Sequence, residues 1–458
     1  MRILINSINF APELTSTGKY TGEMAVWLAD RGHDVRVVTT PPHYPSWRIS
    51  EGYRWWRFKR EKWHESADSS GRVDVFRCPA WIPRVPRGWR RLLYLASFSL
   101  SSWPVMLMHI FWRPDVVILI EPTLFCTPQT LIVAWFSRAA AWLHVQDFEV
   151  DVAFQLRDFS SSRLQPSLRV LERFLLSKFA RVSAISDRMV ERLLAKGVDA
   201  SRTVLFPNWV DASEIFPLTA PNPLRRDLGI SDHAIVALYS GSMGLKQGLS
   251  LLIDASRLLV HRQDIVFVMC GEGPYRQALI EMGARAENLV FLPLQPADRL
   301  NELLNLADIH LLPQLAGAAD LVMPSKLTGM MASGKAVLAT AGEETQLAKV
   351  LVGRGLCTRP GDAAAFASAI ECLADDTELR LQMGIEAQKY AMIHLNREHI
   401  LSSFESSLKN TCRHSSLGVQ QGLPEGPGLR RSTMTDIAVQ GGDSADCRTE
   451  GMTIPHEP

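Results

Sequence analysis

The stretch DLVMPSKLTGMMASGKAVLAT, residues 320–340, is the key to the organisation of the chain. It predicts a loop, a short helix and a buried strand. Pro324 fixes φ at the start of the helix, Ser325 is a capping residue beside it, and Gly334 ends the helix. Backbone N–H groups and the positive end of the helix dipole then point at the preceding loop, where Lys326 adds a full charge. The stretch therefore predicts a site for an anion, most simply a phosphate; the alternative is an ordinary capped helix.

The segments before this stretch repeat the order strand, glycine-containing loop, helix. The repeats begin IVALYSGSMGLKQGL (235–249) and IVFVMCGEGPYRQAL (265–279). Glycines at the strand ends, such as Gly241 and Gly271, let the backbone approach a ligand. Lys246 and Lys326 are expected in two loops at the same edge of one sheet, where together they can neutralise a diphosphate.

The N-terminal half begins with the same plan. Residues 2–10 predict a strand, residues 11–23 a loop with glycine, and residues 24–30 a helix before a second strand. This order is the opening of a doubly wound parallel sheet. The loop is not GxGxxG, so nothing points to a dinucleotide. Gly18 either lets the backbone approach a phosphate or simply makes the turn.

An acidic loop follows the apolar strand predicted at residues 139–145. The segment HVQDFEVD places His144, Asp147, Glu149 and Asp151 at the carboxyl end of a parallel strand, where open α/β sheets bind their ligands. A carboxylate or an imidazole there can orient or deprotonate a hydroxyl group. Alternatively, His144 finishes the strand and the acids cap the next helix.

Two segments suggest contact with sugars or lipid. Residues 43–63 are rich in Tyr, Trp and Arg and predict a surface loop with a hairpin, suited to sugar stacking, a lipid headgroup surface or packing of an insertion. Residues 92–112 carry no formal charge and are long enough to span a bilayer. Serines, a proline and a following buried strand favour peripheral membrane attachment over a span. Burial of this helix in the domain core is the other alternative.

Composition limits the class of protein. The chain has 458 residues, 47% of them hydrophobic and 21% charged, which suits a globular protein with two or three cores. Its net charge of +1 argues against nucleic acid as a partner. Seven scattered cysteines without a CxxC pair predict reduced thiols in a cytoplasmic protein and no metal site. The start, MRILINSINF, is strand-like and is not expected to be a signal peptide.

Domain boundaries follow from composition shifts. The expected divisions are an N-terminal domain at 1–216, a proline-rich linker at 217–232, a C-terminal domain at 233–395, a helix at 396–411 and a disordered tail at 412–458. Two doubly wound α/β domains joined in this way face a central cleft.

Taken together, these motifs resemble family 4 glycosyltransferases of the GT-B fold, and within them the colanic acid and exopolysaccharide biosynthesis type. The resemblance covers about residues 1–410. It is carried by APELTSTGKYTGE, LHVQDFEVD, SAISDRM, FPNWVD, YSGSMGLKQGL, CGEGP and PSKLTGMMASGKAV. It implies a retaining, metal-independent transfer of a sugar from a nucleotide diphosphate. The implied partners are a nucleotide-sugar donor, GDP- or UDP-linked with GDP-fucose first, and a polyprenyl-diphosphate-linked saccharide acceptor at the cytoplasmic membrane surface. No cofactor is implied.

The resemblance also assigns residues. It implies that Lys246 is the phosphate-binding lysine, that the amide of Gly18 approaches the diphosphate, and that His144 and Asp147 lie on the acceptor side. The implied donor-site residues are Gly241, Gly271, Glu272, Pro293, Leu294, Gln295, Pro324, Ser325 and Lys326.

The sequence departs from the family pattern in two places. The arginine usually found shortly before the lysine is missing from residues 242–245, and the usual pair of glutamates is replaced near Leu321 and Gly329. These departures keep two alternatives open, a nucleotide-sugar epimerase with the GT-B fold and a non-catalytic nucleotide-sugar-binding subunit of a polysaccharide assembly complex.

Overall fold

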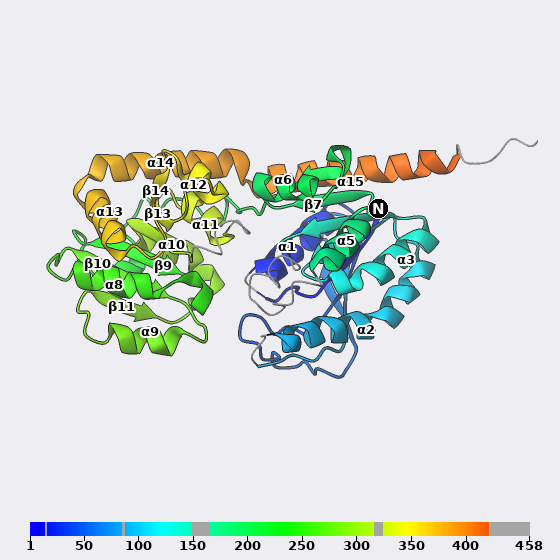
Figure 1. The fold of residues 1–458 in the computed structure, drawn as a ribbon, viewed down its shortest axis with the longest axis horizontal. Helices are drawn as coiled ribbons and strands as arrows, with labels where there is room; N and C mark the ends of the chain where they lie inside the picture. The colour runs from blue at the N-terminus through cyan, green and yellow to red at the C-terminus, as the bar shows by residue number, and fades with distance from the viewer. Residues whose placement is uncertain (14–15, 85–87, 149–164, 316–323, 421–458) are drawn as a thin grey trace, which may run out of the picture. The chain divides into compact units, whose positions relative to one another are not determined.

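Two mainly parallel β-sheets, packed on both faces, form the framework of the chain (Figure 1). The computed structural model describes residues 1–13, 16–84, 88–148, 165–315 and 324–420. Residues 1–416 form one compact unit. The two sheets confirm the predicted pair of doubly wound α/β domains.

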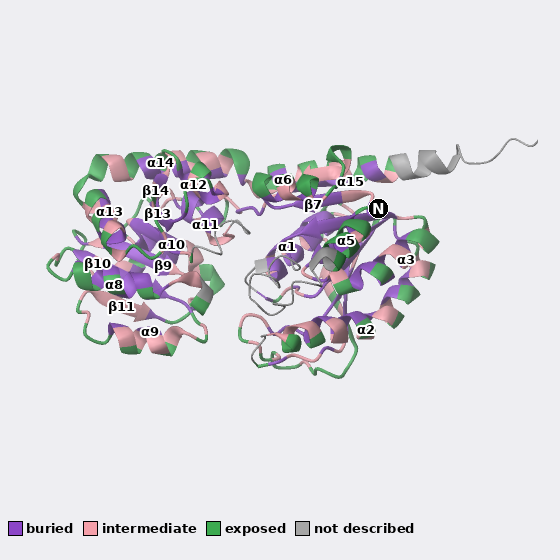
Figure 2. Cartoon of the chain, viewed as in Figure 1, coloured by how far each residue is buried: buried purple, intermediate pink, exposed green. Residues whose placement is uncertain are grey.

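The first sheet has eight strands in the order β3-β4-β2-β1-β5-β6-β7-β8. Its strands are β1 (Arg2–Ser7), β2 (Asp34–Thr39), β3 (Lys59–Glu65), β4 (Arg72–Arg77), β5 (Val116–Glu121), β6 (Ala140–Val145), β7 (Arg181–Ala184) and β8 (Thr203–Leu205). Its helices are α1 (Ser16–Asp30), α2 (Trp89–Trp112), η1 (Leu124–Cys126), α3 (Thr127–Ser137), α5 (Gln165–Leu176), α6 (Asp187–Ala195) and η2 (Ala200–Arg202). The central strands β5 and β6 are buried along their whole length, as expected for mainly apolar strands covered on both faces (Figure 2).

The edge strand β3 pairs antiparallel with β4, whereas the other strands of this sheet pair in parallel. It begins within residues 43–63, but its hairpin partner β4 lies beyond that segment, so the hairpin is shifted towards the C-terminus from its predicted place. Trp55, Trp56 and Phe58 just before it are exposed.

The second sheet has six parallel strands in the order β11-β10-β9-β12-β13-β14. Its strands are β9 (Ile235–Ser240), β10 (Ile265–Cys270), β11 (Leu289–Leu292), β12 (Ile309–Leu312), β13 (Ala336–Thr340) and β14 (Gly355–Thr358). The helices of this half are α7 (Pro223–Asp227), η3 (Leu245–Gln247), α8 (Ser250–Leu258), α9 (Arg276–Gly283), η4 (Ala297–Arg299), α10 (Leu300–Leu306), α11 (Lys326–Ala332), α12 (Gln346–Leu351), α13 (Ala363–Asp375) and α14 (Thr377–His394).

The last helix, α15 (Arg397–Gln420), belongs to the core of the first domain (Figure 1). Its Leu401 and Phe404 are buried there, and the Phe404 ring stacks on Phe206 with ring centroids 4.0 Å apart. The helix continues to Gln420, so the start of the disordered tail predicted at residue 412 is wrong; Cys412 is still partly buried against the core of the first domain. Residues 421–458 of the predicted tail lie outside the described residues.

The expected linker at 217–232 is not a simple connector. It contains α7, and Leu224 of this helix is buried in a core of the second domain with residues of β9 and β10. Part of the segment therefore folds with the second domain.

Candidate functional site

The most informative position in the second sheet is β9, because the chain order reverses there. β10 lies on one side of β9 and β12 on the other. In open α/β sheets, ligands bind outside the carboxyl ends of the strands at such a switch point. The loop after β9 begins with Gly241, and α11 begins at Lys326 after the loop that follows β12.

Lys326 lies at this switch point with its side chain folded over β9. Its Nζ donates a hydrogen bond of 2.6 Å to Tyr239 Oη and lies 4.2 Å from the centre of the Tyr239 ring. Tyr239 Oη in turn donates to the carbonyl oxygen of Ser242 at 2.6 Å. Burial lowers the pKa of the Lys326 ammonium group to about 7. At pH 7 the Lys326 side chain is therefore about half protonated in the ligand-free protein, and a neighbouring anion would favour its charged form.

The glycines of this edge have a different role from the one predicted. Gly241, Gly271 and Gly273 have φ values of 135°, 145° and 157°. A Cβ atom on Gly271 would lie 1.9 Å from the carbonyl oxygen of Gly241, and one on Gly273 would lie 2.3 Å from that of Met243. Close approach of neighbouring backbone therefore requires glycine at position 271, and the approach of a ligand there stays a prediction. At Gly241 a Cβ atom would meet Lys326 Cε at 2.3 Å, so glycine there makes room for the lysine.

The other predicted donor-site residues of β10 and β11 follow neighbouring strand ends. Glu272 is exposed and lies 3.7 Å from Arg276 Nε. The Pro293 carbonyl accepts from Gln295 Nε2 at 3.1 Å, and Leu294 is exposed. Because Cys270 and Leu292 are partners in the β10–β11 ladder, these loops lie at the same edge of the sheet.

Pro324 and Ser325 precede α11 as predicted, but the capping role of Ser325 is wrong. Ser325 has helical φ and ψ angles of −60° and −20°, and its side chain makes no capping hydrogen bond. Its carbonyl accepts from Thr328 Oγ1 at 3.0 Å and from Tyr20 Oη at 3.3 Å. Lys246 lies in η3, between Gly244 and Gly248, and its role stays a prediction.

His144 is a core residue of the first domain, which contradicts its predicted role beside a substrate. The imidazole is buried at the end of β6. Its Nδ1 lies 3.0 Å from Ser183 Oγ, and its Nε2 lies 2.9 Å from the Gln146 amide nitrogen. Burial lowers the pKa of His144 to about 3, so the ring stays neutral. Asp147 follows it in a partly buried position, whereas Glu149 and Asp151 lie outside the described residues.

Gly18 also differs from its expected role. A Cβ atom on Gly18 would lie 2.8 Å from both Cβ and Oε2 of Glu13. The buried Glu13 carboxylate accepts hydrogen bonds from the backbone N–H groups of His43 and Tyr44, both at 3.0 Å, and from Asn9 Nδ2 at 2.9 Å. Glycine at this position therefore admits a carboxylate that ties the loop after β1 to the loop after β2.

Sequence reasoning missed this cluster around Glu13. It lies at the switch point of the first sheet, where β1 has β2 on one side and β5 on the other. His43 Nε2 lies 2.9 Å from Tyr94 Oη, and its Nδ1 lies 2.9 Å from the Pro41 carbonyl. Burial lowers the pKa of His43. The sequence signal that could have revealed this cluster is Glu13 itself, an acidic residue five positions before Gly18 in the loop after β1.

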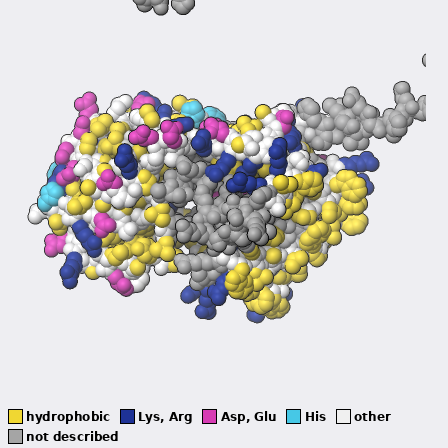
Figure 3. Space-filling view, in the orientation of Figure 1, with side chains coloured by type: hydrophobic (Ala, Val, Ile, Leu, Met, Phe, Trp, Pro, Cys, Tyr) yellow, Lys and Arg dark blue, Asp and Glu magenta, His cyan; other side chains and the backbone are white. Residues whose placement is uncertain are grey.

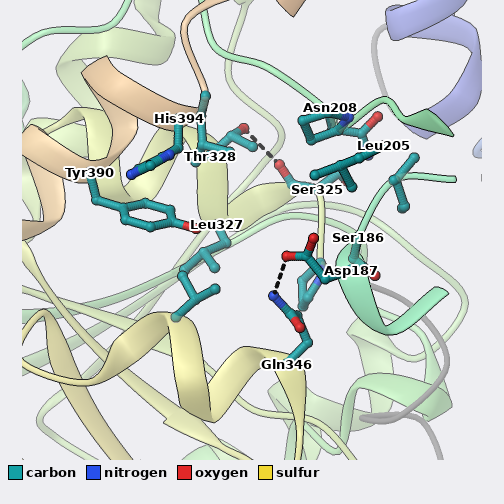
Figure 4. Close-up of a pocket in the computed structure, with 15 residues that line it drawn as sticks. Ser186, Asp187, Leu205, Asn208, Ser325, Leu327, Thr328, Gln346, Tyr390 and His394 are labelled. Atoms are coloured by element: carbon teal, nitrogen blue, oxygen red, sulfur yellow. Dashed lines mark hydrogen bonds between the residues drawn. The ribbon is translucent and has the colours of Figure 1, made fainter. Parts of the chain in front are cut away.

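A cavity of about 150 Å³ lies beside Ser325 (Figure 4). Among its lining residues, Gln346 Nε2 donates a hydrogen bond of 3.4 Å to Asp187 Oδ2. Its lining residues are Ile185, Ser186, Asp187, Leu205, Pro207, Asn208, Pro324, Ser325, Leu327, Thr328, Gln346, Val350, Tyr390, His394 and Leu395. Two of the predicted donor-site residues, Pro324 and Ser325, line this cavity.

A search for metal ligands over the described residues finds no group of three or more His, Cys, Asp or Glu side chains placed to hold an ion.

Comparisons with known proteins agree with this architecture. Residues 16–209 match the family described as glycosyl transferase 4-like domain, and residues 222–390 match glycosyl transferases group 1. The chain is 36% identical over 419 residues to the colanic acid biosynthesis glycosyl transferase WcaI of Escherichia coli, covering 89% of this chain and 100% of the relative.

Solved structures show the same fold. The sucrose-phosphate synthase of Thermosynechococcus elongatus superposes with a TM-score of 0.68 at 17% identity, covering 90% of this chain and 100% of its own. Alr3699/HepE of Anabaena, solved in complex with UDP, superposes with a TM-score of 0.64 at 16% identity over the same shares. The domain matches and the full-length relative show that this chain is an enzyme of the glycosyltransferase class and belongs to the family 4 glycosyltransferases of the GT-B fold.

Proposed function

We propose that the protein is a retaining glycosyltransferase that moves a sugar from a nucleoside diphosphate to a lipid-linked saccharide in exopolysaccharide biosynthesis. The pathway class comes from the name of the Escherichia coli relative, and the nucleotide donor from the UDP complexes of HepE. The observation that carries the proposal is Lys326, a buried lysine at the sheet switch point whose lowered pKa a bound diphosphate would raise again.

The chemistry needs positive charge at the leaving group. The bond between the sugar anomeric carbon and the β-phosphate oxygen breaks, and its electron pair stays on that oxygen. Protonated Lys326 and Lys246 would stabilise this developing charge more than the ground state, which lowers the barrier. The acceptor hydroxyl attacks from the same face, its oxygen bonds to the anomeric carbon, and its proton passes to the leaving phosphate. In this scheme no metal ion or cofactor is required.

On the acceptor side, the proposal keeps Asp147 and drops His144. Asp147 lies in the loop after β6 and is partly buried, so it is the remaining candidate for orienting the acceptor hydroxyl. The acceptor is a polyprenyl-diphosphate-linked saccharide, and the protein would work at the cytoplasmic surface of the membrane as a peripheral protein.

A thermal-shift series tests the donor proposal first. Purified protein is heated with GDP, UDP or ADP and their common sugars, with EDTA present throughout. A ligand that binds the folded state raises the melting temperature, and we expect GDP or UDP to do so. No shift with any of the three nucleotides would overturn the proposed donor site.

Product analysis tests the transfer. With the stabilising nucleotide-sugar and a lipid-linked saccharide acceptor, NMR of the product should show the anomeric configuration of the donor, and Lys246→Ala should reduce turnover strongly without changing the melting temperature. An inverted product would refute the retaining scheme. A changed sugar formed without acceptor would identify an epimerase, and nucleotide binding without turnover would favour the non-catalytic alternative.

A further inference from the structure

Helix α2 exposes apolar side chains although its other face is already packed in the core. The buried residues of that face are Tyr94, Leu95, Phe98, Ser99, Ser102, Met106 and His109. The opposite face presents Leu93, Leu100, Leu107 and Phe111, spaced as one helical stripe, and Phe111 is 89% exposed and Leu100 72% exposed. A helix that only covers a protein core would present polar side chains on its exposed face. The exposed stripe therefore leaves large apolar side chains in unfavourable contact with water.

Helix α3 and the turn η1 before it also expose large apolar side chains. Phe125, Trp135 and Phe136 are exposed, Trp135 by 74%, whereas the buried residues of α3 are Thr127, Gln129, Thr130, Val133 and Ala134. Hydrogen bonds join α2 to both elements, since Gln129 Nε2 of α3 donates to Ser102 Oγ at 2.8 Å and Ser99 Oγ donates to the Phe125 carbonyl of η1 at 2.7 Å.

The exposed apolar side chains of α2, η1 and α3 form one surface, the α2–α3 apolar face. α2 and α3 pack against each other. Hydrophobic side chains gather over both helices in the space-filling view (Figure 3). Large contiguous apolar patches on soluble proteins mark interaction sites.

Charge at the ends of the helices indicates what this face contacts. Neither α2 nor α3 contains an acidic residue. Arg90 near the start of α2, Arg113 after its end and Arg138 after the end of α3 are exposed, and none forms an ion pair within the described part of the chain. An apolar face with tryptophans and bordering arginines is complementary to a bilayer interface with anionic headgroups.

A transmembrane span is excluded by packing, although α2 is long and apolar enough for one. Tyr94, Phe98 and Met106 on its other face are buried in the core of the first domain. Withdrawing α2 into a bilayer would expose that core. The helix can contact lipid with one face while the other stays packed.

We infer that the α2–α3 apolar face docks on the surface of an anionic lipid bilayer, with α2 lying in the plane of the membrane. Its exposed leucine, phenylalanine and tryptophan side chains enter the headgroup region, and the bordering arginines contact lipid phosphates. The inference rests on the proposed function in one respect, since the lipid-linked acceptor would lie in the same bilayer.

Vesicle co-sedimentation of the full chain tests this inference. The protein is mixed with vesicles of phosphatidylethanolamine and phosphatidylglycerol, or of phosphatidylcholine alone. The triple variant Leu100→Gln, Phe111→Gln, Trp135→Gln should bind the anionic vesicles about a hundredfold more weakly than the unmodified chain. The variant Arg113→Gln should lose about fivefold on anionic vesicles and almost nothing on neutral ones.

The matched control is Val352→Gln, Ile393→Gln, which replaces exposed apolar residues of the second domain and should bind vesicles like the unmodified chain. An unmodified chain that stays in the supernatant, or a triple variant that binds equally well, would overturn the inference. Concentration-dependent self-association that the triple variant abolishes, without vesicle binding, would assign the face to a second copy and likewise overturn it. Nucleotide-induced thermal shifts, measured on the same samples, report on the proposed function separately.

Discussion

Replacing Lys326 with methionine removes the ammonium group at the switch point of the second sheet and keeps a side chain of similar length. Burial holds the pKa of Lys326 near 7 in the ligand-free protein, and its Nζ contacts Tyr239 Oη at 2.6 Å. A bound diphosphate favours the ammonium form and should raise this pKa. Binding of a nucleoside diphosphate should therefore take up a proton when the pH is above 7.

The size of the effect follows from the titration. Between pH 7 and pH 9 the protonated fraction of Lys326 in the free protein falls from about one half to about one hundredth. If the pKa in the complex lies above 9, the dissociation constant of GDP or UDP should rise about 50-fold over this range. The phosphates of the ligand contribute little to the change, because their second pKa is about 6.

Isothermal titration calorimetry at several pH values measures the dissociation constant, and buffers of different ionisation enthalpy measure proton uptake. In Lys326→Met the dissociation constant of GDP or UDP should be larger than in the unmodified protein at pH 7, and it should not change from pH 7 to pH 9. Lys335→Met is the matched control, since burial also lowers the pKa of Lys335 but this residue precedes β13 at the opposite edge of the sheet. A flat wild-type profile, or an equal slope in Lys326→Met, would refute the assignment of Lys326 to the diphosphate.

Stability of the ligand-free protein offers an independent check with a defined sign. The pKa of Lys326 is lowered from the ordinary lysine value of 10.5 to about 7, so between these values the unfolded chain binds more protons than the folded one. The free energy of unfolding should therefore rise with pH across this window, by an amount on the order of a few kcal/mol at most. Lys326→Met should remove this rise in urea denaturation curves.

Three further substitutions test other parts of the structure. Tyr239→Phe removes the oxygen that accepts from Lys326 Nζ, so the pH dependence of nucleotide binding should shift to lower pH; an unchanged midpoint in calorimetry would contradict this contact. His144→Leu should lower the free energy of unfolding by about 1–3 kcal/mol in urea titrations, because buried hydrogen-bond partners lose the imidazole, while the pH profile of transfer stays in place; a displaced profile would return His144 to the active site. Phe404→Ala should cost about 3–5 kcal/mol by loss of stacking on Phe206, and an unaltered urea midpoint would show that α15 does not hold the first domain together.

The local pattern of the sequence was sufficient for the backbone elements. Pro324 and Gly334 bracket α11, which runs from Lys326 to Ala332 before β13, as the stretch 320–340 predicted. Alternating strands, glycine loops and helices predicted two doubly wound domains, because strand and helix periodicity and turn residues act within a few positions of one another. The family resemblance came from the same local motifs.

Assignments that depend on solvation were less successful. His144 was predicted beside a substrate because it ends a strand, yet Ser183 of β7 and Gln146 enclose it. Gly18 was assigned to a phosphate, yet the Glu13 side chain occupies that space. Neither neighbour can be inferred from strand or helix patterns, since each contact depends on how loops and strands pack.

By itself, the sequence determined the order of strands and helices, the two-domain α/β plan and the position of the candidate loops along the chain. Tertiary structure alone decided that Lys326 folds over Tyr239 and that burial lowers its pKa to about 7. It also decided that α15 packs into the core of the first domain. The physical reason is that secondary structure follows from neighbours along the chain. Burial, pKa and helix docking depend instead on atoms from distant segments that the fold brings together.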